Sequence, residues 1–202
     1  MEIIAENPGN ISGWQTDHDG KLRLAFTADG VNTSILYRHT EQDTFTAILT
    51  TDFREEVNPM FFTFDNKNLY VSSNRNRDKS ALYIFDIETA TETDLIFEHD
   101  EVDILQAMYS KKRKVLTGVS AYTSKMEYNF FDAWRENVQK ELESQLPGVE
   151  VRLNGLDDNE TMALVRTFSD KTRGAYYLFN SKTKKLNKLA DISPWLDPSK
   201  MA

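Results

Sequence analysis

The hydrophobic pattern of this sequence repeats every 47 residues, and this repeat constrains the fold more than any other feature. Three copies share one register, which aligns Leu22 and Leu24 with Leu69 and Val71, and then with Ala163 and Val165. The same register aligns Ile35, Tyr37, Ile48 and Leu49 with Leu82, Ile84, Leu95 and Ile96, and then with Tyr176, Leu178, Leu189 and Ala190. A divergent copy, Met108 to Val119, fills the gap. The chain is therefore expected to fold as four similar units.

Each copy has the alternation of short β-strands separated by turns. The second copy shows it most clearly, with strands expected over Asn58–Phe64, Leu69–Ser73, Ala81–Ile87 and Thr93–Phe97. Four antiparallel strands in about 40 to 50 residues are typical of one propeller blade. The sequence thus predicts an all-β protein, a β-propeller portion of about four four-stranded blades. Their expected bounds are 1–52, 53–100, 101–148 and 149–193.

One segment departs from this pattern, in the position where the third copy would have its outer strand. Apolar residues recur there at helical spacing, namely Phe131, Trp134, Val138, Leu142 and Leu146. Asp132 is a candidate N-cap and Pro147-Gly148 a stop signal, so a surface helix is expected over about 132–146. Its Trp134, Val138 and Leu142 are expected to point inward.

Composition excludes several classes of function. The 202 residues contain no cysteine and carry a formal charge of −8, with no basic stripe, which argues against nucleic acid as a partner. His18, His39 and His99 lie far apart without ligand spacing, so neither a metal nor a cofactor is expected. No apolar run is long enough for a membrane helix, and the first residues do not resemble a signal peptide. A soluble protein is expected, and composition does not choose between cytoplasm and periplasm.

The search for reaction chemistry is mostly negative. The sequence has no G-x-S-x-G, G-x-G-x-x-G or phosphate-binding loop, so no catalytic residue is expected in this chain. The acidic run from Glu98 to Glu101, with Asp103, could hold a cation, help a general acid or form a solvated loop. Arg75 and Arg77, in the loop Asn74–Lys79, could bind a peptide carboxylate bidentately, or they could belong to an ordinary turn.

Three phrases of the sequence together carry a family likeness. They are Leu69-Tyr70-Val71-Ser72-Ser73-Asn74-Arg75, the helix phrase Phe130-Phe131-Asp132 with Trp134 and Leu146-Pro147-Gly148, and the closing Ser193-Pro194-Trp195-Leu196-Asp197-Pro198. In this order they resemble the propeller of the prolyl oligopeptidase family, in particular its acylaminoacyl-peptidase-like members. In that family the propeller covers an α/β-hydrolase domain that carries a Ser-His-Asp triad, and it restricts entry to short peptides.

The resemblance implies that this chain is the non-catalytic propeller domain of a serine peptidase, controlling substrate access and docking onto a hydrolase domain. Residues 194–202 would begin the linker toward that domain, with Trp195 and Leu196 at the interface between the domains. Short peptides are the expected ligands. A homodimer is also expected for the isolated chain, because incomplete wheels expose the faces of their end blades. Four-bladed wheels exist, so closure of the chain on itself is the alternative to this homodimer. The alternative is a stand-alone binding or scaffold propeller with no peptidase activity.

Overall fold

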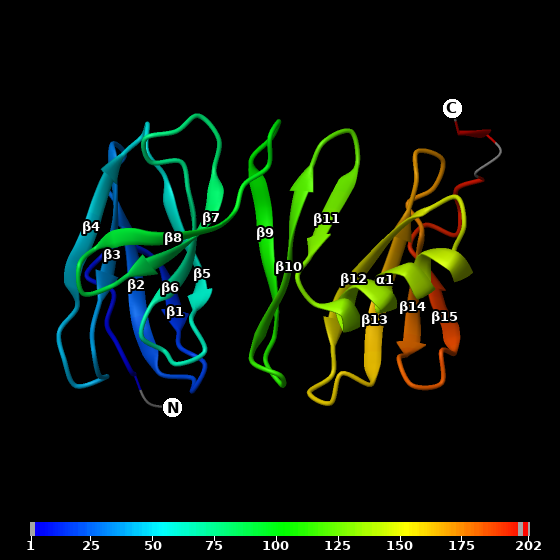
Figure 1. Ribbon diagram of the computed structural model, residues 1–202, viewed down its shortest axis with the longest axis horizontal. Coiled ribbons are helices and arrows are strands. Elements are labelled where there is room, and N and C mark those ends of the chain that lie inside the picture. Colours follow the sequence, from blue (N-terminus) through cyan, green and yellow to red (C-terminus); the bar gives the residue numbers. More distant parts are fainter. Residues whose placement is uncertain (1–2, 198–199, 202) are drawn as a thin grey trace. The chain divides into compact units, whose positions relative to one another are not determined.

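The computed structural model describes residues 3–197 and 200–201, and over these residues the chain forms fifteen strands and one helix (Figure 1). The strands form four antiparallel sheets that follow one another along the chain. The all-β class and the single inserted helix predicted from the sequence are thereby confirmed.

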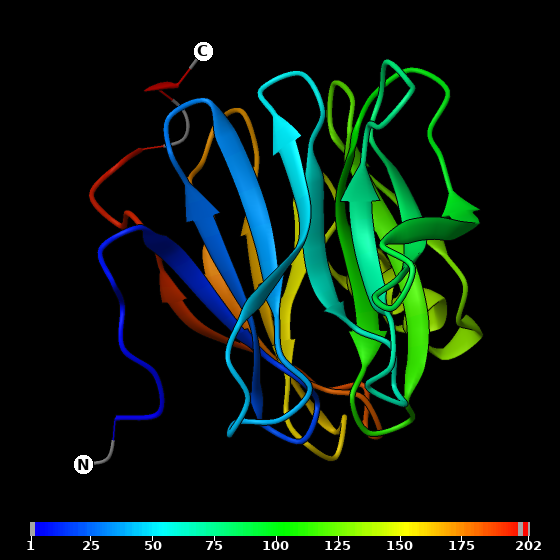
Figure 2. The same cartoon turned by 90° about the vertical axis from the view of Figure 1, so that its left-hand side faces the viewer.

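Three of the sheets have four strands each, hydrogen-bonded in sequence order. The first contains β1 (Ile11–Thr16), β2 (Leu22–Ala28), β3 (Asn32–Tyr37) and β4 (Thr46–Asp52), and Figure 2 shows it in shades of blue. The second contains β5 (Val57–Phe62), β6 (Leu69–Ser73), β7 (Ala81–Asp86) and β8 (Thr91–Phe97). The fourth contains β12 (Glu150–Leu156), β13 (Met162–Phe168), β14 (Ala175–Asn180) and β15 (Leu186–Asp191).

The third sheet has three strands, β9 (Ile104–Ser110), β10 (Val115–Tyr122) and β11 (Met126–Phe130). The helix α1 (Ala133–Gln145) follows β11 directly, where the other copies place their fourth strand. Four strands per blade therefore holds for three of the copies, and the helix replaces a strand in the other, as its hydrophobic spacing indicated.

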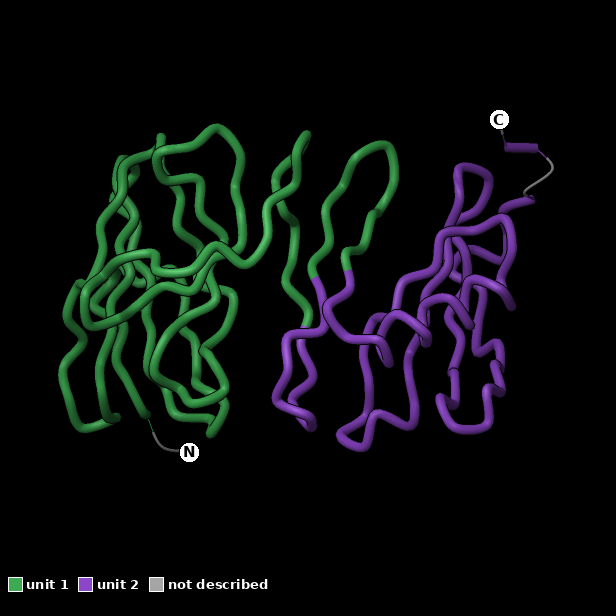
Figure 3. Tube along the Cα trace, viewed as in Figure 1, with its two compact units in different colours: residues 1–108, 119–129 green, residues 109–118, 130–202 purple. Residues whose placement is uncertain are grey.

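The chain divides into two compact units, which Figure 3 shows in different colours. The first contains residues 1–108 and 119–129, and the second contains residues 109–118 and 130–202. The first two sheets lie wholly in the first unit, and α1 and the fourth sheet lie wholly in the second.

The core of the first unit lies between its two complete sheets. The first sheet contributes Leu24, Ile35 and Tyr37, and the second contributes Val57, Phe62, Leu69, Val71, Phe85 and Ile87. Side chains one repeat apart also touch, since the Asn66 side-chain amide donates to the Asp19 carboxylate at 2.9 Å. Successive sheets within this unit thus pack face to face in the register of the sequence repeat.

The core of the second unit lies between α1 and the fourth sheet. Val138 and Leu142 of the helix are buried against Val151, Val165 and Phe179, and the half-buried Trp134 packs on the same cluster. Trp134, Val138 and Leu142 of the helix thus point toward the core, as the sequence predicted. Two polar residues accompany them: Gln139 is buried, donates to the Val151 carbonyl at 3.0 Å, and accepts from Arg135 at 3.1 Å.

Aspartates close the first turn of the first sheet and the first turn of the fourth sheet. One Asp17 carboxylate oxygen accepts from the backbone N–H groups of Asp19 and Lys21, at 3.0 and 2.9 Å. Asp157 does the same for Thr161 and Met162, at 2.6 and 2.9 Å. Their residue types are therefore explained by turn geometry without a ligand.

Candidate functional site

Arg75 and Arg77 lie in the loop between β6 and β7, and both are close to glutamates of the first unit. Arg77 forms an ion pair with Glu98 and donates to the Tyr83 hydroxyl at 2.9 Å. Partial burial lowers the pKa of Arg77, but its hydrogen bonds to Glu98 and Tyr83 raise it, and its net pKa lies above the usual value. Arg75 Nε lies 3.8 Å from the Glu55 carboxylate. A peptide carboxylate would have to compete with these glutamates.

The same loop is tied to the segment that precedes β5. The Asn74 N–H donates to the Glu56 carbonyl at 3.1 Å, and the Asn74 side-chain oxygen accepts from the Glu56 N–H at 2.6 Å. The Asn74 amide also donates to the Arg54 carbonyl at 3.3 Å. These bonds hold the base of the loop that carries both arginines, so its position relative to the first two sheets is fixed.

A pocket of about 290 Å³ lies beside Glu56, between the first two sheets. Its apolar wall includes Phe26, Ile35, Leu49 and Val57, and its rim is rich in hydroxyl groups. Two of these residues form hydroxyl pairs between β3 and β4: Thr33 pairs with Thr51 at 3.1 Å, and Ser34 pairs with Thr50 at 2.8 Å. The pocket therefore offers both apolar and polar contacts to a side chain.

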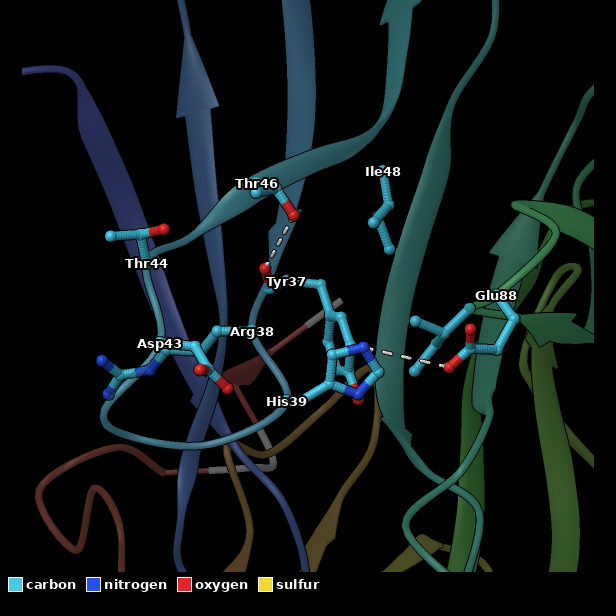
Figure 4. Close-up of a pocket in the computed structure, with 9 residues that line it drawn as sticks. Tyr37, Arg38, His39, Asp43, Thr44, Thr46, Ile48 and Glu88 are labelled. Atoms are coloured by element: carbon cyan, nitrogen blue, oxygen red, sulfur yellow. Dashed lines mark hydrogen bonds and ion pairs between the residues drawn. The ribbon is translucent and has the colours of Figure 1, made fainter.

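A second pocket, of about 360 Å³, opens where the end of β3 approaches the turn between β7 and β8 (Figure 4). Figure 4 shows the His39 ring beside Tyr37 and facing Glu88. The Tyr37 hydroxyl lies 3.4 Å from His39 Nδ1, and His39 Nε2 lies 4.0 Å from the Glu88 carboxylate. Across the pocket, hydrogen bonds from the Thr40 side chain and N–H lower the pKa of Asp43, which keeps it ionised. The rim is polar, and Ile48 and Ile87 supply apolar contacts.

The acidic run lies in the connection from β8 to β9, where its histidine closes a turn and Asp103 accepts from the segment before β7. His99 Nδ1 accepts from the N–H groups of Glu101 and Val102 at 3.1 and 3.3 Å, and its Nε2 lies 3.7 Å from the Glu127 carboxylate. Asp103 accepts from the Ser80 N–H at 2.6 Å. Over the residues that the structure describes, no three His, Cys, Asp or Glu side chains form a group that could hold a metal ion.

Trp195 and Leu196 follow β15 in the second unit. The Leu196 N–H donates to the Ser193 carbonyl at 3.1 Å, which turns the chain after the buried Ser193. Trp195 is 75% exposed and Leu196 is 37% exposed, so both can reach a partner. Pro198, Ser199 and Ala202, which belong to the expected linker, lie outside the described residues.

The sequence analysis did not predict a cluster in the second unit in which one arginine, Arg113, contacts two carboxylates and a tryptophan ring. Arg113 donates from Nη1 to Asp132 at 2.6 Å and from Nε to Glu160 at 2.8 Å, and its guanidinium lies 4.9 Å from the Trp134 ring centre. Arg113 and Glu160 are one repeat apart, which was the available signal. The cluster joins the β9–β10 turn to α1 and to the first turn of the fourth sheet, so its role is structural.

The comparisons with known proteins give structural matches only. No family model matches the sequence, and no curated protein matches it. A prolyl endopeptidase structure matches with a TM-score of 0.54 and 10% identity, over 90% of this chain and 29% of its own. Prolyl oligopeptidase B from Galerina marginata matches with a TM-score of 0.53 and 12% identity, over 98% of this chain and 29% of its own. The S511A mutant of puromycin hydrolase matches with a TM-score of 0.51 and 12% identity, over 96% of this chain and 31% of its own.

These matches show the fold. The chain is similar to the propeller part of prolyl peptidases, which confirms at the level of the fold the resemblance indicated by its sequence phrases. It spans less than a third of the length of those enzymes. Over the described residues, moreover, no helix is both long and apolar enough to span a bilayer.

Proposed function

We propose that this chain is the non-catalytic propeller part of a prolyl-oligopeptidase-like serine peptidase, where it controls substrate access and docks onto an α/β-hydrolase domain. The observation that carries this proposal is the structural likeness, which extends over nearly the whole of this chain but less than a third of each peptidase. The lack of a nucleophile elbow in the sequence agrees with it, because the chemistry would then belong to another domain.

The proposed roles follow from what the residues can do. Sheets that are packed face to face give a rigid wall, and a rigid wall can exclude folded proteins while it admits short peptides. Arg75 and Arg77 would meet a peptide carboxylate by exchanging it for Glu55 and Glu98. Trp195 is the anchor we assign to the hydrolase domain, since exposed aromatic residues often carry much of the energy of an interface.

The test starts from the gene. A G-x-S-x-G motif is expected in the same reading frame within a few hundred residues after Ala202. The downstream segment, produced separately, should bind this chain in isothermal titration calorimetry, and Trp195→Ala should weaken that binding at least tenfold. Phe53→Ala, which removes another exposed aromatic ring, is the matched control and should leave the affinity unchanged. A frame without the motif would instead favour the stand-alone binding propeller.

A further inference from the structure

The second unit carries more positive than negative charge, in a chain whose formal charge is −8. Its residues, 109–118 and 130–202, include 15 lysines and arginines and 11 aspartates and glutamates. Six of the lysines lie in only two turns, between β9 and β10 and between β14 and β15, and we call them the turn lysines: Lys111, Lys112, Lys114, Lys182, Lys184 and Lys185. All six are exposed, and none of them forms an ion pair with a carboxylate of the described residues. The positive charge of this unit is therefore concentrated in two turns.

Contacts within the second unit bring these two turns to one end of it, with the β12–β13 turn between them. On one side, Lys112 Nζ donates to the Asn159 carbonyl at 2.9 Å, and Arg113 Nε donates to the Glu160 carboxylate at 2.8 Å. On the other side, the Ser181 hydroxyl donates to the Glu160 carbonyl at 2.8 Å. Figure 3 shows the three turns at the lower end of the purple unit. We call this end, with the turn lysines on it, the basic end.

The fold does not require lysines in the β14–β15 turn. Two repeats of 47 residues place Glu88 on Lys182 and Ala90 on Lys184. Ala90 and Lys184 have similar left-handed φ values, +53° and +60°, so both turns bend at the same position. The second sheet thus makes this turn with an acidic residue and an alanine. The lysines of the fourth sheet are therefore not explained by the geometry of the turn.

The β9–β10 turn departs from its counterpart in the second sheet in the same way. Its left-handed position is Lys114, with a φ of +53°, whereas the β5–β6 turn has Asn66 there, with a φ of +58°. Asparagine adopts this conformation at a lower cost than lysine does. The β5–β6 turn also contains Asp65, which accepts from the Lys67 N–H at 3.2 Å, as turn aspartates commonly do. Four successive basic residues, 111–114, stand in place of that turn chemistry.

The carboxylates of the β12–β13 turn offset only part of the charge of the basic end. Asp157 accepts from two backbone N–H groups of its own turn, and Glu160 is paired with Arg113, which leaves the exposed Asp158. Turns project from the ends of strands, so the turn lysines form a convex surface, and both pockets described above lie in the first unit. A small anion would meet this surface from one side only. An extended anionic surface, in contrast, can contact both basic turns at once.

We propose that the basic end binds the surface of a membrane that contains anionic phospholipids, with the turn lysines against the phosphate headgroups. Clusters of about four to eight basic residues are typical of proteins that bind such membranes. The lysine ammonium suits this partner, because it is a compact, hydrated charge that needs no paired geometry. The one arginine of these turns, Arg113, is already bound to Asp132 and Glu160, so the basic end lacks the free guanidinium groups that commonly contact nucleic-acid bases.

The acidic residues elsewhere in the chain do not prevent this binding. The screening length is about 8 Å at physiological salt, so carboxylates farther than this from the membrane surface oppose binding only weakly. Attraction between the lysines and the headgroups should be screened in turn when the salt concentration rises. This inference does not depend on the proposed peptidase function.

The test is sedimentation of the purified chain with lipid vesicles. The chain should bind vesicles of phosphatidylcholine with about 30% phosphatidylglycerol, should be released at about 0.5 M salt, and should not bind phosphatidylcholine alone. Each lysine near an anionic membrane contributes about fivefold to the partition coefficient. The double variants Lys111→Gln/Lys114→Gln and Lys182→Gln/Lys185→Gln should therefore each lower that coefficient about 25-fold.

A matched control removes the same charge from the first unit. Lys67 lies in the β5–β6 turn and Lys125 in the β10–β11 turn, and both are exposed. The double variant Lys67→Gln/Lys125→Gln should leave the partition coefficient unchanged. Circular dichroism melting curves should match the wild type for all three double variants. If Lys114→Gln, at the left-handed position, makes its variant melt early, Lys111→Gln alone replaces the pair and should lower the coefficient about fivefold.

Each other outcome overturns the proposal. A wild-type chain that does not bind the anionic vesicles contradicts it directly. Equal weakening in the control variant would show that net charge acts rather than the basic end. An effect from only one of the two turns would show that they do not contact one surface together. Release of the chain from the vesicles by an equal phosphate concentration of a DNA duplex, or by an equal carboxylate concentration of polyglutamate, would assign the basic end to another kind of polyanion.

Discussion

At the scale of single residues, Gly174 makes the strongest demand on the backbone. Its φ of +82° lies in the left-handed region, and a Cβ at this position would stand 1.7 Å from the Thr167 carbonyl oxygen. That oxygen belongs to β13, in the middle of the fourth sheet, so it cannot move without breaking the sheet. Gly174→Ala should therefore lower the free energy of unfolding by roughly 3 kcal/mol or more.

Chemical denaturation checks this expectation, with Gly155→Ala as its control. A Cβ on Gly155 meets nothing within 4 Å, and its φ is not in the left-handed region. That variant should stay within about 0.5 kcal/mol of the wild type. Equal effects of the two substitutions would contradict the argument from the close approach.

At the scale of elements, α1 depends on Asp132, which has two roles. One of its carboxylate oxygens caps the helix by accepting from the Arg135 N–H at 2.9 Å, and the other binds Arg113. Burial raises the pKa of Asp132, but the hydrogen bonds from Arg113 and from the Arg135 backbone outweigh it, so its net pKa lies below the usual value. A carboxyl group whose pKa is lowered on folding stabilises the folded state above its unfolded pKa, and it loses that contribution as the pH falls through its folded pKa.

Two substitutions separate these roles. Asp132→Asn keeps a cap and removes the charge, whereas Asp132→Ala removes both. The free energy of unfolding of the alanine variant should therefore be about 1 kcal/mol lower than that of the asparagine variant. The stability gap between wild type and Asp132→Asn should be full at pH 6 and should shrink as the pH falls below about 4. Urea unfolding at several pH values measures it. A gap that grew on acidification would show that the Arg113 ion pair does not stabilise the fold.

The elements also show how far sequence reasoning reaches. The repeat and the alternation predicted the strands, and the helical spacing predicted α1, because hydrophobic period follows directly from which face is buried. The repeat did not, however, predict on which face of its sheet each side chain lies. The repeat aligns Leu24 with Val71 and Tyr37 with Ile84, but Leu24 pairs with Tyr37 in the first sheet, whereas Val71 pairs with Tyr83 in the second, an offset of one residue. Leu24 and Val71 consequently both lie in the core between the first two sheets.

The candidate site shows the same limit of sequence reasoning, here for contacts between residues far apart in the sequence. The loop of Arg75 and Arg77 was visible in the sequence, since clustered Asn, Asp and Arg between two strands indicate a polar turn. The glutamates that meet these arginines were not, because Glu55 and Glu98 are about twenty residues away and only the folded sheet brings them close. No local sequence pattern predicts an ion pair between residues so far apart. The sequence therefore suggested that both arginines were available to a ligand, whereas the structure places a glutamate beside each of them.

At the scale of the whole molecule, the proposed division of labour predicts that this chain alone is inactive. Hydrolysis of a peptide by a serine peptidase needs a serine whose proton is taken by a histidine. The histidines of this chain have other neighbours: His18 Nε2 lies 2.8 Å from the Phe62 carbonyl, His39 lies between Tyr37 and Glu88, and His99 Nδ1 accepts backbone N–H groups. The purified chain should therefore leave acyl-peptide and aminoacyl chromogenic substrates intact.

The measurement needs a control for contaminating peptidases. Any release of chromophore should disappear on further purification, and a fluorophosphonate probe should not label this chain. His39→Ala and His99→Ala should leave the residual rate unchanged, because neither ring would take part in the reaction. Hydrolysis that persists, is blocked by the probe, and falls in one histidine variant would place a nucleophile within this chain, and the propeller would then have to be regarded as an enzyme in its own right.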